Sequence, residues 1–363
     1  MNTPMQMTLL QKKQAALLYH FASLDYLKGL QQRVNDLMAF IDPTLDLAKA
    51  QNRDSVLIDP RWGSRDTSAN WGNNAWPFLA DFQMSIAKDI ANRAFEIYNR
   101  TGTYQCARGI SEYSMQWTTP DEENKFNALF KRISSHANNI DDTMKKNQNN
   151  WDDFTFALAW QDFKGQFAQL PKFQIRADIE GETGKVPVRT GVYIPQDDPH
   201  GSLQFAWTGG GRGQLIESNT FNEMGLDALK AVGRRDLWLN EQAMFEFATS
   251  PKYESMLKSD IFFNSLPEVS LAPAAVSGQA FTTRPCKWYY VELVNGEFED
   301  IDDNLIPGLP TPLRSKAGQP CPQSGLWQAL DVNAQQRTLQ QGEIMPDLRS
   351  AYGLTVWEYV DQR

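Results

Sequence analysis

Histidine and carboxylate side chains are the residues of this sequence whose types could perform acid–base chemistry or hold a metal ion. The chain has three histidines, and His200 closely follows Asp197 and Asp198 in a turn. An imidazole beside a carboxylate can act as general acid and base, or both can ligate a metal. A solvated turn is the more ordinary interpretation, and His20 and His136 fall in helical patterns that need no catalytic role. We therefore predict that the chain is not an enzyme, and we keep a site at His200 as the alternative.

Two further patterns could bind phosphate or move protons. The run TGGGRG at 208–213 has the composition of a phosphate-binding loop, but QLIES follows it instead of a helix start, and no Gly-Lys-Ser/Thr is present. A flexible hairpin loop is the better interpretation. Glu180 and Glu182 could form an acid–base pair, although a charged loop at a strand end is the default. Motifs of the types HExxH, CxxC and GxSxG are absent, so we predict no metal and no cofactor.

The segment at 295–304, NGEFEDIDDN, carries five acidic side chains and no basic one, a local charge of −5. It does not fit a calcium-binding loop, which needs a glycine at its sixth position and a glutamate at its twelfth. One interpretation is a solvated hairpin tip. The other is a docking patch for lysine and arginine side chains, in which a phenylalanine serves as an apolar anchor. The candidate binding residues are therefore Glu297, Phe298, Glu299, Asp300, Asp302 and Asp303.

The charge of the whole chain restricts its partners. There are 35 Lys and Arg against 44 Asp and Glu, a net charge of −9, and residues 171–363 hold 25 of the acids and 17 of the bases, a net −8. A direct nucleic-acid partner is not expected, because binding phosphates needs a basic surface. A cationic partner that docks on the second half is the simplest functional use of the acidic excess, and solubility is the alternative.

The sequence also predicts a compartment. No apolar run approaches the ~20 residues needed to span a bilayer. The first residues include Lys12 and Lys13 and lack the apolar stretch and small-residue cleavage site of a secretory signal. The three cysteines lie far apart and cannot form an even disulfide framework. We expect a cytoplasmic protein without membrane contact.

The first half of the chain has helical periodicity. Apolar residues over 17–41 fall on one stripe, which Asp42-Pro43 is expected to end. A connector at 59–77 has turn chemistry throughout, and an apolar helical face follows it over 79–97. Thr119-Pro120-Asp121-Glu122 is a capping box that predicts the start of another long helix.

The second half changes to a strand pattern. PVRTGVYI (187–194) and SLQFAWT (202–208) are predicted strands, and KWYYVELV (287–294) is a strand that should turn at Asn295-Gly296 into a hairpin. A second capping box, Thr220-Phe221-Asn222-Glu223, predicts a helix that ends at Gly233. The segments near the C-terminus read as short strands or a mixture of strand and helix.

These patterns predict an α+β protein. Residues 1–168 form a helical region, and residues 169–363 form a mixed region that contains antiparallel strands and helices and packs against the first. The second region is also where short, dense motifs gather.

The motifs lie mainly between residues 182 and 229, as ETGK, RTGVY, DDP, LQFAWTG and TFNE with GL behind it. A second group follows, with CPQSGLW at 321–327, GEIMP at 342–346 and Trp357. Together they closely resemble the signature of bacterial polymorphic-toxin immunity proteins, families 71 and 72. The resemblance covers 171–363, while the first half shares only its helical, Trp-punctuated character. One departure is Val188, where the family pattern has a second proline before Arg-Thr-Gly.

The resemblance implies a protein that binds and neutralises a cognate antibacterial toxin, often one delivered by type VI secretion. Inhibition would be stoichiometric, by occlusion of the toxin's active site or by locking of its conformation. The acidic excess then predicts a toxin domain with a basic binding surface. Two alternatives stay open: an enzyme that reverses the toxin's modification of its target, and a structural or adaptor protein of the secretion apparatus.

Overall fold

Capping residues define the first two helices of the computed structural model, which describes residues 6–146, 151–167, 169–259, 268–299, 313–329, 335–348 and 354–360. Helix α1 (Leu9–Ala22) begins behind Thr8, whose side chain accepts the N–H of Gln11. Helix α2 (Leu24–Ala50) begins behind Ser23, whose side chain accepts the N–H of Tyr26. Because Ser23 has an extended backbone, it ends α1 and starts α2 in a new direction.

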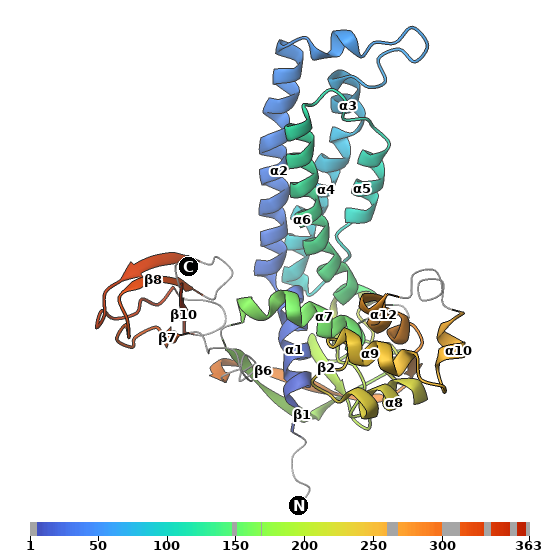
Figure 1. Ribbon diagram of the computed structural model, residues 1–363, viewed down its shortest axis with the longest axis vertical. Helices are drawn as coiled ribbons and strands as arrows, with labels where there is room; N and C mark the ends of the chain where they lie inside the picture. Colours follow the sequence, from blue (N-terminus) through green and yellow to red (C-terminus); the bar gives the residue numbers. More distant parts are fainter. Residues whose placement is uncertain are drawn as a thin grey trace, which may run out of the picture.

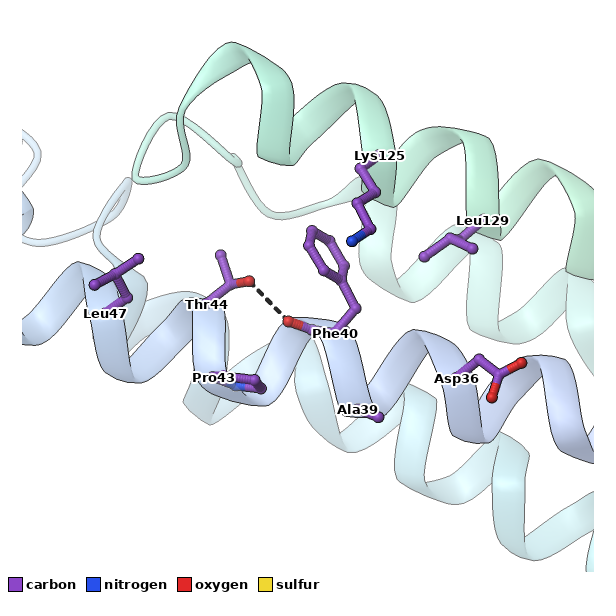
Figure 2. A pocket seen from close by; sticks show the side chains of 8 residues that line it. All are labelled: Asp36, Ala39, Phe40, Pro43, Thr44, Leu47, Lys125 and Leu129. Atoms are coloured by element: carbon purple, nitrogen blue, oxygen red, sulfur yellow. Dashed lines mark hydrogen bonds between the residues drawn. The ribbon is translucent and has the colours of Figure 1, made fainter.

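The predicted helix end at Asp42-Pro43 is wrong, because α2 continues through Pro43 to Ala50. Proline lacks the N–H that would bond the carbonyl four residues earlier, at Ala39. One residue on, Thr44 Oγ1 donates a hydrogen bond of 2.7 Å to the carbonyl of Phe40 (Figure 2). Buried leucine and isoleucine side chains continue on both sides of the proline. Their packing against α4 and α6 outweighs the local cost of proline, ~3 kcal/mol in a helix interior.

The helices of the first half form an elongated bundle (Figure 1). Helix α6 begins at the predicted capping box: Thr119 Oγ1 accepts the N–H of Glu122, and Glu122 Oε2 accepts the N–H of Thr119 at 2.8 Å. This prediction is confirmed. Besides α1 and α2, the bundle region contains α3 (Ser68–Asn74), α4 (Trp76–Asn92), α5 (Thr103–Ser111), α6 (Pro120–Met144) and α7 (Asp153–Phe163).

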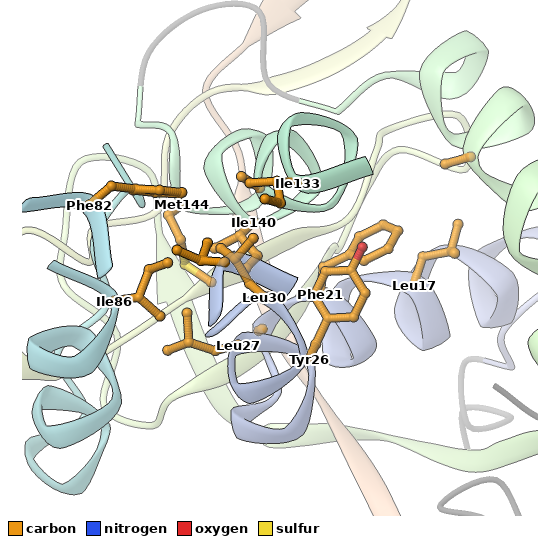
Figure 3. Close-up of a cluster of buried hydrophobic side chains, with 14 of the residues drawn as sticks. Leu17, Phe21, Tyr26, Leu27, Leu30, Phe82, Ile86, Ile133, Ile140 and Met144 are labelled. Carbon is orange, nitrogen blue, oxygen red and sulfur yellow. The ribbon is translucent and has the colours of Figure 1, made fainter. Parts of the chain in front are cut away.

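The largest hydrophobic core joins the helical half to the first sheet. Figure 3 shows its helical part, where Phe21 and Leu30 of α1 and α2 meet Ile140 of α6. The same cluster includes Val192 and Val291 from the sheet, both fully buried. Burial on this scale is the dominant stabilising contribution to a fold. The helices and the first sheet therefore share one core.

The first sheet is antiparallel, with the strand order β1-β6-β2-β3. Strand β3 falls within its predicted segment, and β2 overlaps the predicted 187–194 but begins at Gly191 and ends at Pro195. Strand β1 was not predicted. Tyr19 of α1 fastens the helical half to this sheet, because its hydroxyl donates to the carbonyl of Val291 at 2.5 Å. The strands are β1 (Leu170–Glu182), β2 (Gly191–Pro195), β3 (Gln204–Ala206) and β6 (Lys287–Glu299).

The predicted hairpin turn at Asn295-Gly296 is wrong, because β6 runs through it as one strand. Phe173 pairs with Leu293 and Pro171 pairs with Phe298, so the residues between them on β6 bulge out of register. Gly296 has φ +78°, which glycine adopts readily at a bulge. A long partner, β1, supplies the hydrogen bonds that keep β6 extended beyond the bulge.

A smaller unit of helices surrounds the two-stranded sheet of β4 (Ser218–Phe221) and β5 (Phe281–Arg284). The predicted helix here is α8 (Glu223–Val232), and it stops at Gly233 as expected. The predicted capping box is wrong: Asn222 caps α8 by accepting the N–H of Gly225 at 3.1 Å, while Thr220 belongs to β4. The other helices are α9 (Glu241–Ala248), α10 (Glu254–Leu257) and α12 (Ala272–Ser277).

The described C-terminal residues form a second antiparallel sheet, in the order β7-β10-β8-β9. Trp327 and Trp357 lie fully buried at its centre, in a cluster separate from the main core. The strands are β7 (Arg314–Lys316), β8 (Gly325–Ala329), β9 (Gln336–Leu339) and β10 (Val356–Tyr359). The molecule is thus α+β, with helices in the first half and antiparallel sheets in the second (Figure 1). Among the described residues, no helix is both long and apolar enough to cross a membrane.

Candidate functional site

The acidic segment predicted as a docking patch begins at the end of β6, and two of its carboxylates face lysines of the same chain. Glu297 pairs with Lys172 of β1 at 2.6 Å, and Glu299 pairs with Lys12 of α1 at 2.7 Å. Phe298 is half-buried, opposite Pro171. The remaining candidates, Asp300, Asp302 and Asp303, lie outside the described residues. Within the described part, the charge of this segment is therefore partly balanced by lysines inside the chain.

The turn at His200 uses its carboxylate for structure. Asp198 Oδ1 accepts the backbone N–H of His200 at 2.9 Å, and Asp198 Oδ2 lies 2.9 Å from the guanidinium of Arg284. The imidazole ring instead lies beside the ring of Phe221, with centroids 5.6 Å apart. Nowhere in the described ranges do three or more His, Cys, Asp or Glu side chains gather as a possible metal site. The geometry of the turn is therefore that of an ion-paired structural loop.

The Gly-rich run at 208–213 packs closely against backbone of the helical half and of the preceding residue, Trp207. A Cβ on Gly209 would lie 2.3 Å from the carbonyl oxygen of Phe95, and one on Gly213 would lie 1.9 Å from that of Trp207. Thr208 also donates to the carboxylate of Glu96, which holds the pKa of Glu96 below its ordinary value. These glycines are required for close packing. They do not lead into a helix N-terminus, because β4 precedes the next helix.

The two acids considered as an acid–base pair lie on β1. Glu182 forms an exposed ion pair with Lys185 at 2.5 Å. The hydrogen bond from the Lys185 ammonium lowers the pKa of Glu182, which is the opposite of what a general acid at neutral pH requires. Between the two acids, Gly181 packs against the side chain of Leu215. The pair is best explained as the charged edge of a strand.

A shallow depression of about 570 Å³ lies between α2 and α6, beside Pro43 (Figure 2). Its lining is mostly apolar, and Lys125 Nζ lies 4.4 Å above the ring of Phe40. The carboxylate of Asp36 at its edge accepts a hydrogen bond from Gln32. The lining has no nucleophile paired with a base, so it can hold an apolar side chain but offers no covalent or acid–base chemistry.

Sequence reasoning missed one exposed feature, a small hairpin at residues 59–63 between α2 and α3, here called the tip hairpin. The N–H of Asp59 donates to the carbonyl of Gly63 at 3.0 Å, and the N–H of Gly63 donates back at 2.8 Å. Asp59 Oδ1 also accepts the N–H groups of Arg61 and Trp62, at 2.6 and 3.3 Å. The hairpin lies in the loop at the free end of the bundle (Figure 1). Trp62 in this hairpin is 67% exposed.

Two anchors hold the base of the tip hairpin. The Asp54 carboxylate accepts the N–H and the hydroxyl of Ser68 at the start of α3, both at 2.7 Å. The guanidinium of Arg53 binds the carboxylate of Glu122 through two bonds of 2.6 and 3.3 Å, which lowers the pKa of Glu122. The sequence signal was present in DPRWG, where turn-forming residues surround an Arg-Trp pair.

Comparisons with known proteins give no further assignment: no family model matches the chain, and neither a curated protein nor a solved structure matches it significantly. The likeness to immunity proteins therefore rests on the sequence motifs. Their aromatic residues are parts of the fold, since Tyr193, Phe205 and Trp207 are all buried. The Tyr193 hydroxyl donates to the carbonyl of Arg189 at 2.6 Å, which ties two motif residues together.

Proposed function

We propose that this chain is an immunity protein that binds and neutralises a cognate antibacterial toxin. The toxin is one secreted by a type VI system, and inhibition is stoichiometric occlusion without turnover, in the cytoplasm of the protected cell. The basis for the proposal is the resemblance of the motifs over 171–363 to those of immunity proteins. The structure contributes an argument of its own, because it contains a surface suited to binding another protein.

The observation that carries the proposal is the tip hairpin. Tryptophan and arginine are the residue types most enriched among those that dominate binding energy, and Trp62 stands exposed beside Arg61. The paired backbone bonds and the Asp59 carboxylate hold the hairpin in one conformation before binding. Ordering the surface in advance reduces the entropy lost on association. Such a surface is suited to stable binding without turnover.

The enzymatic alternative receives less support from the geometry. It would place catalysis at His200 with a neighbouring aspartate, and Asp198 is already committed to Arg284 and to the turn backbone. The acidic segment remains a proposed contact for basic side chains of the toxin.

Co-expression tests the proposal directly. We expect the neighbouring gene to encode a large secreted protein with a C-terminal toxin domain. Producing that domain in a sensitive bacterium with increasing amounts of this chain should restore growth only near equimolar amounts. The purified mixture should contain a one-to-one complex. Full protection at a small fraction of the toxin's concentration would favour the enzymatic alternative, and no protection at any ratio would overturn the proposal.

A further inference from the structure

We propose that the tip hairpin enters a cleft lined by carboxylates on the partner protein. In this arrangement Trp62 fills the cleft, and Arg61 and Arg65 pair with its acidic side chains. The inference rests on the proposed function in one respect, that the partner is the toxin. It adds to that function the element of this chain that enters the toxin and the chemistry of the surface that receives it.

The arginines of the tip are the first reason. Arg61 and Arg65 are exposed, and no carboxylate among the described residues lies within ion-pair distance of either. The neighbouring Arg53 is different, since Glu122 holds its guanidinium through two bonds. The nearby acid Asp59 directs an oxygen to the turn backbone. Two guanidinium groups therefore have donors free for a partner, and their planar geometry suits carboxylates.

The apolar surface around the arginines is the second reason. Val56 and Ile58 precede the hairpin and are 85% and 59% exposed, and Trp62 is 67% exposed. Three large apolar side chains exposed within seven residues form a concentrated contact surface for so short a segment. Burying one of them removes its apolar surface from water, which favours association. The partner must therefore offer apolar contact as well as negative charge.

The shape of the tip and the charge of the chain restrict the partner to a protein cleft. The hairpin closes on a single pair of residues, Asp59 and Gly63, and lies in the loop that extends from the end of the bundle (Figure 1). A narrow projection makes most contact when the opposing surface is concave. Nucleic acids and anionic membranes also attract arginine, but they present extended negative charge to a chain whose net charge is −9. An acidic cleft on a protein has its negative charge only where the tip enters, so the rest of this acidic chain is not repelled.

Matched variants of the full chain test this surface. Isothermal titration with the toxin domain should give a Kd about 30-fold higher for Trp62→Ala, the loss expected of a dominant contact residue. The double variant Arg61→Glu with Arg65→Glu should lose at least as much. Tyr104→Ala, at a side chain 74% exposed on α5, and Arg235→Glu, at a side chain 77% exposed, are the controls and should stay within about 2-fold of wild type. Circular dichroism and thermal melting establish that each variant is folded.

Cross-linking then identifies the receiving surface. With a photoreactive p-benzoylphenylalanine in place of Trp62, the linked peptide of the toxin domain should lie beside aspartate or glutamate residues. Changing those acids to lysine should restore binding of the Arg61→Glu, Arg65→Glu variant.

The outcomes separate this inference from the proposed function. Unchanged affinity of the tip variants for a toxin that the wild type binds would overturn the inference and leave the function standing. If the wild type does not bind the toxin domain, the proposed function fails. Binding of the wild type to a 30-base-pair DNA duplex or to phosphatidylserine vesicles, lost in the double variant, would overturn the protein-cleft assignment.

Discussion

The Asp59 carboxylate accepts the backbone N–H of Trp62, and this hydrogen bond restrains the backbone that carries the exposed indole. The same oxygen accepts the N–H of Arg61, so one side chain orders the backbone of two of the three residues proposed to enter the partner. Asp59 thus organises the binding surface without having to touch the partner.

Asp59→Ala should therefore reduce affinity through disorder of the tip hairpin. The amide protons of Arg61 and Trp62 lose their acceptor, and hydrogen exchange at both should become faster. The free energy of unfolding should change by less than about 1 kcal/mol, because the hairpin is exposed and lies outside the core. Exchange mass spectrometry and urea unfolding measure the two effects. Unchanged hydrogen exchange at these amides would show that the backbone hydrogen bonds between residues 59 and 63 order the hairpin without the Asp59 carboxylate.

Reversing the acidic segment should slow association if it contacts a basic surface of the toxin. The variant changes Glu297, Asp300 and Asp302 to lysine, and stopped-flow association rates should fall most at low salt. Protection should weaken in parallel. Equal association rates for variant and wild type at both low and high salt would show that this segment is not part of the interface.

Glu299 needs a different design, because its ion pair with Lys12 is more buried than the exposed pair of Glu297 with Lys172. Glu299→Lys alone places two ammonium groups together. The resulting repulsion would destabilise the fold, so a loss of binding would have two explanations. The exchange of both charges, Lys12→Glu with Glu299→Lys, keeps the pair and reverses the charge at position 299. Loss of binding in the exchanged pair, with thermal stability near wild type, would assign Glu299 to the interface. Normal binding would assign it to the fold.

His136 should make the fold sensitive to acid. Its Nδ1 accepts from Arg33 Nε at 3.1 Å, so the ring proton is on Nε2, which donates to the carbonyl of Tyr26 at 2.7 Å. Burial lowers the pKa of His136 to about 4, below the value of about 6.5 in an unfolded chain. Between these values the unfolded state binds more protons, so this contribution to stability is lost as pH falls below about 6.5.

Urea unfolding at pH 7.5 and at pH 5 isolates that contribution when wild type is compared with His136→Gln. Glutamine has an acceptor and a donor but does not titrate. The stability of the wild type should fall more on acidification than that of the variant. Parallel decreases would mean that the acid response comes from other groups, such as His20, whose pKa burial lowers to about 3.

His200→Ala distinguishes the binder from the enzyme. The occlusion account expects the variant to fold and to protect at the same equimolar ratio as wild type, because the imidazole contacts Phe221 rather than a reacting group. A dose–response series of growth against the ratio of chain to toxin measures this. A folded variant that has lost protection would restore the enzymatic alternative.

Pro43→Ala should stabilise the protein by about 1–3 kcal/mol, because it returns a helical N–H to α2 and removes the ring clash. The change lies beside the depression in Figure 2 and leaves the buried face of α2 intact. Urea unfolding provides the comparison. A loss of stability would show instead that the packing of Phe40 beneath Lys125 depends on the local geometry that proline imposes.

Local sequence signals predicted the start or end of an element correctly where interactions between residues close in sequence determine it. Thr119 and Glu122 satisfy each other's backbone N–H groups within one turn, so the start of α6 could be read directly. Pro43 shows the opposite case, since packing of the flanking turns against α4 and α6 overrides it. Asn295-Gly296 failed as a hairpin signal because the decisive partner, β1, is more than a hundred residues earlier in the chain.

The candidate site was predicted less well than the fold. Counting acids found Glu297 and Glu299 but could not show that Lys172 and Lys12 face them. The tip hairpin was read only as turn chemistry, because exposure of Trp62 depends on where the loop stands at the end of the bundle. Tryptophan is buried in most settings, and ten others in this chain gave no reason to single this one out.

Titration of the toxin domain with this chain, followed by residual toxin activity, tests the central claim most directly. The account predicts a linear loss of toxin activity that ends at one equivalent of chain, with a one-to-one complex by light scattering. Trp62→Ala should shift this titration to higher concentrations. Toxin activity that remains unchanged at several equivalents of folded wild-type chain would contradict the account.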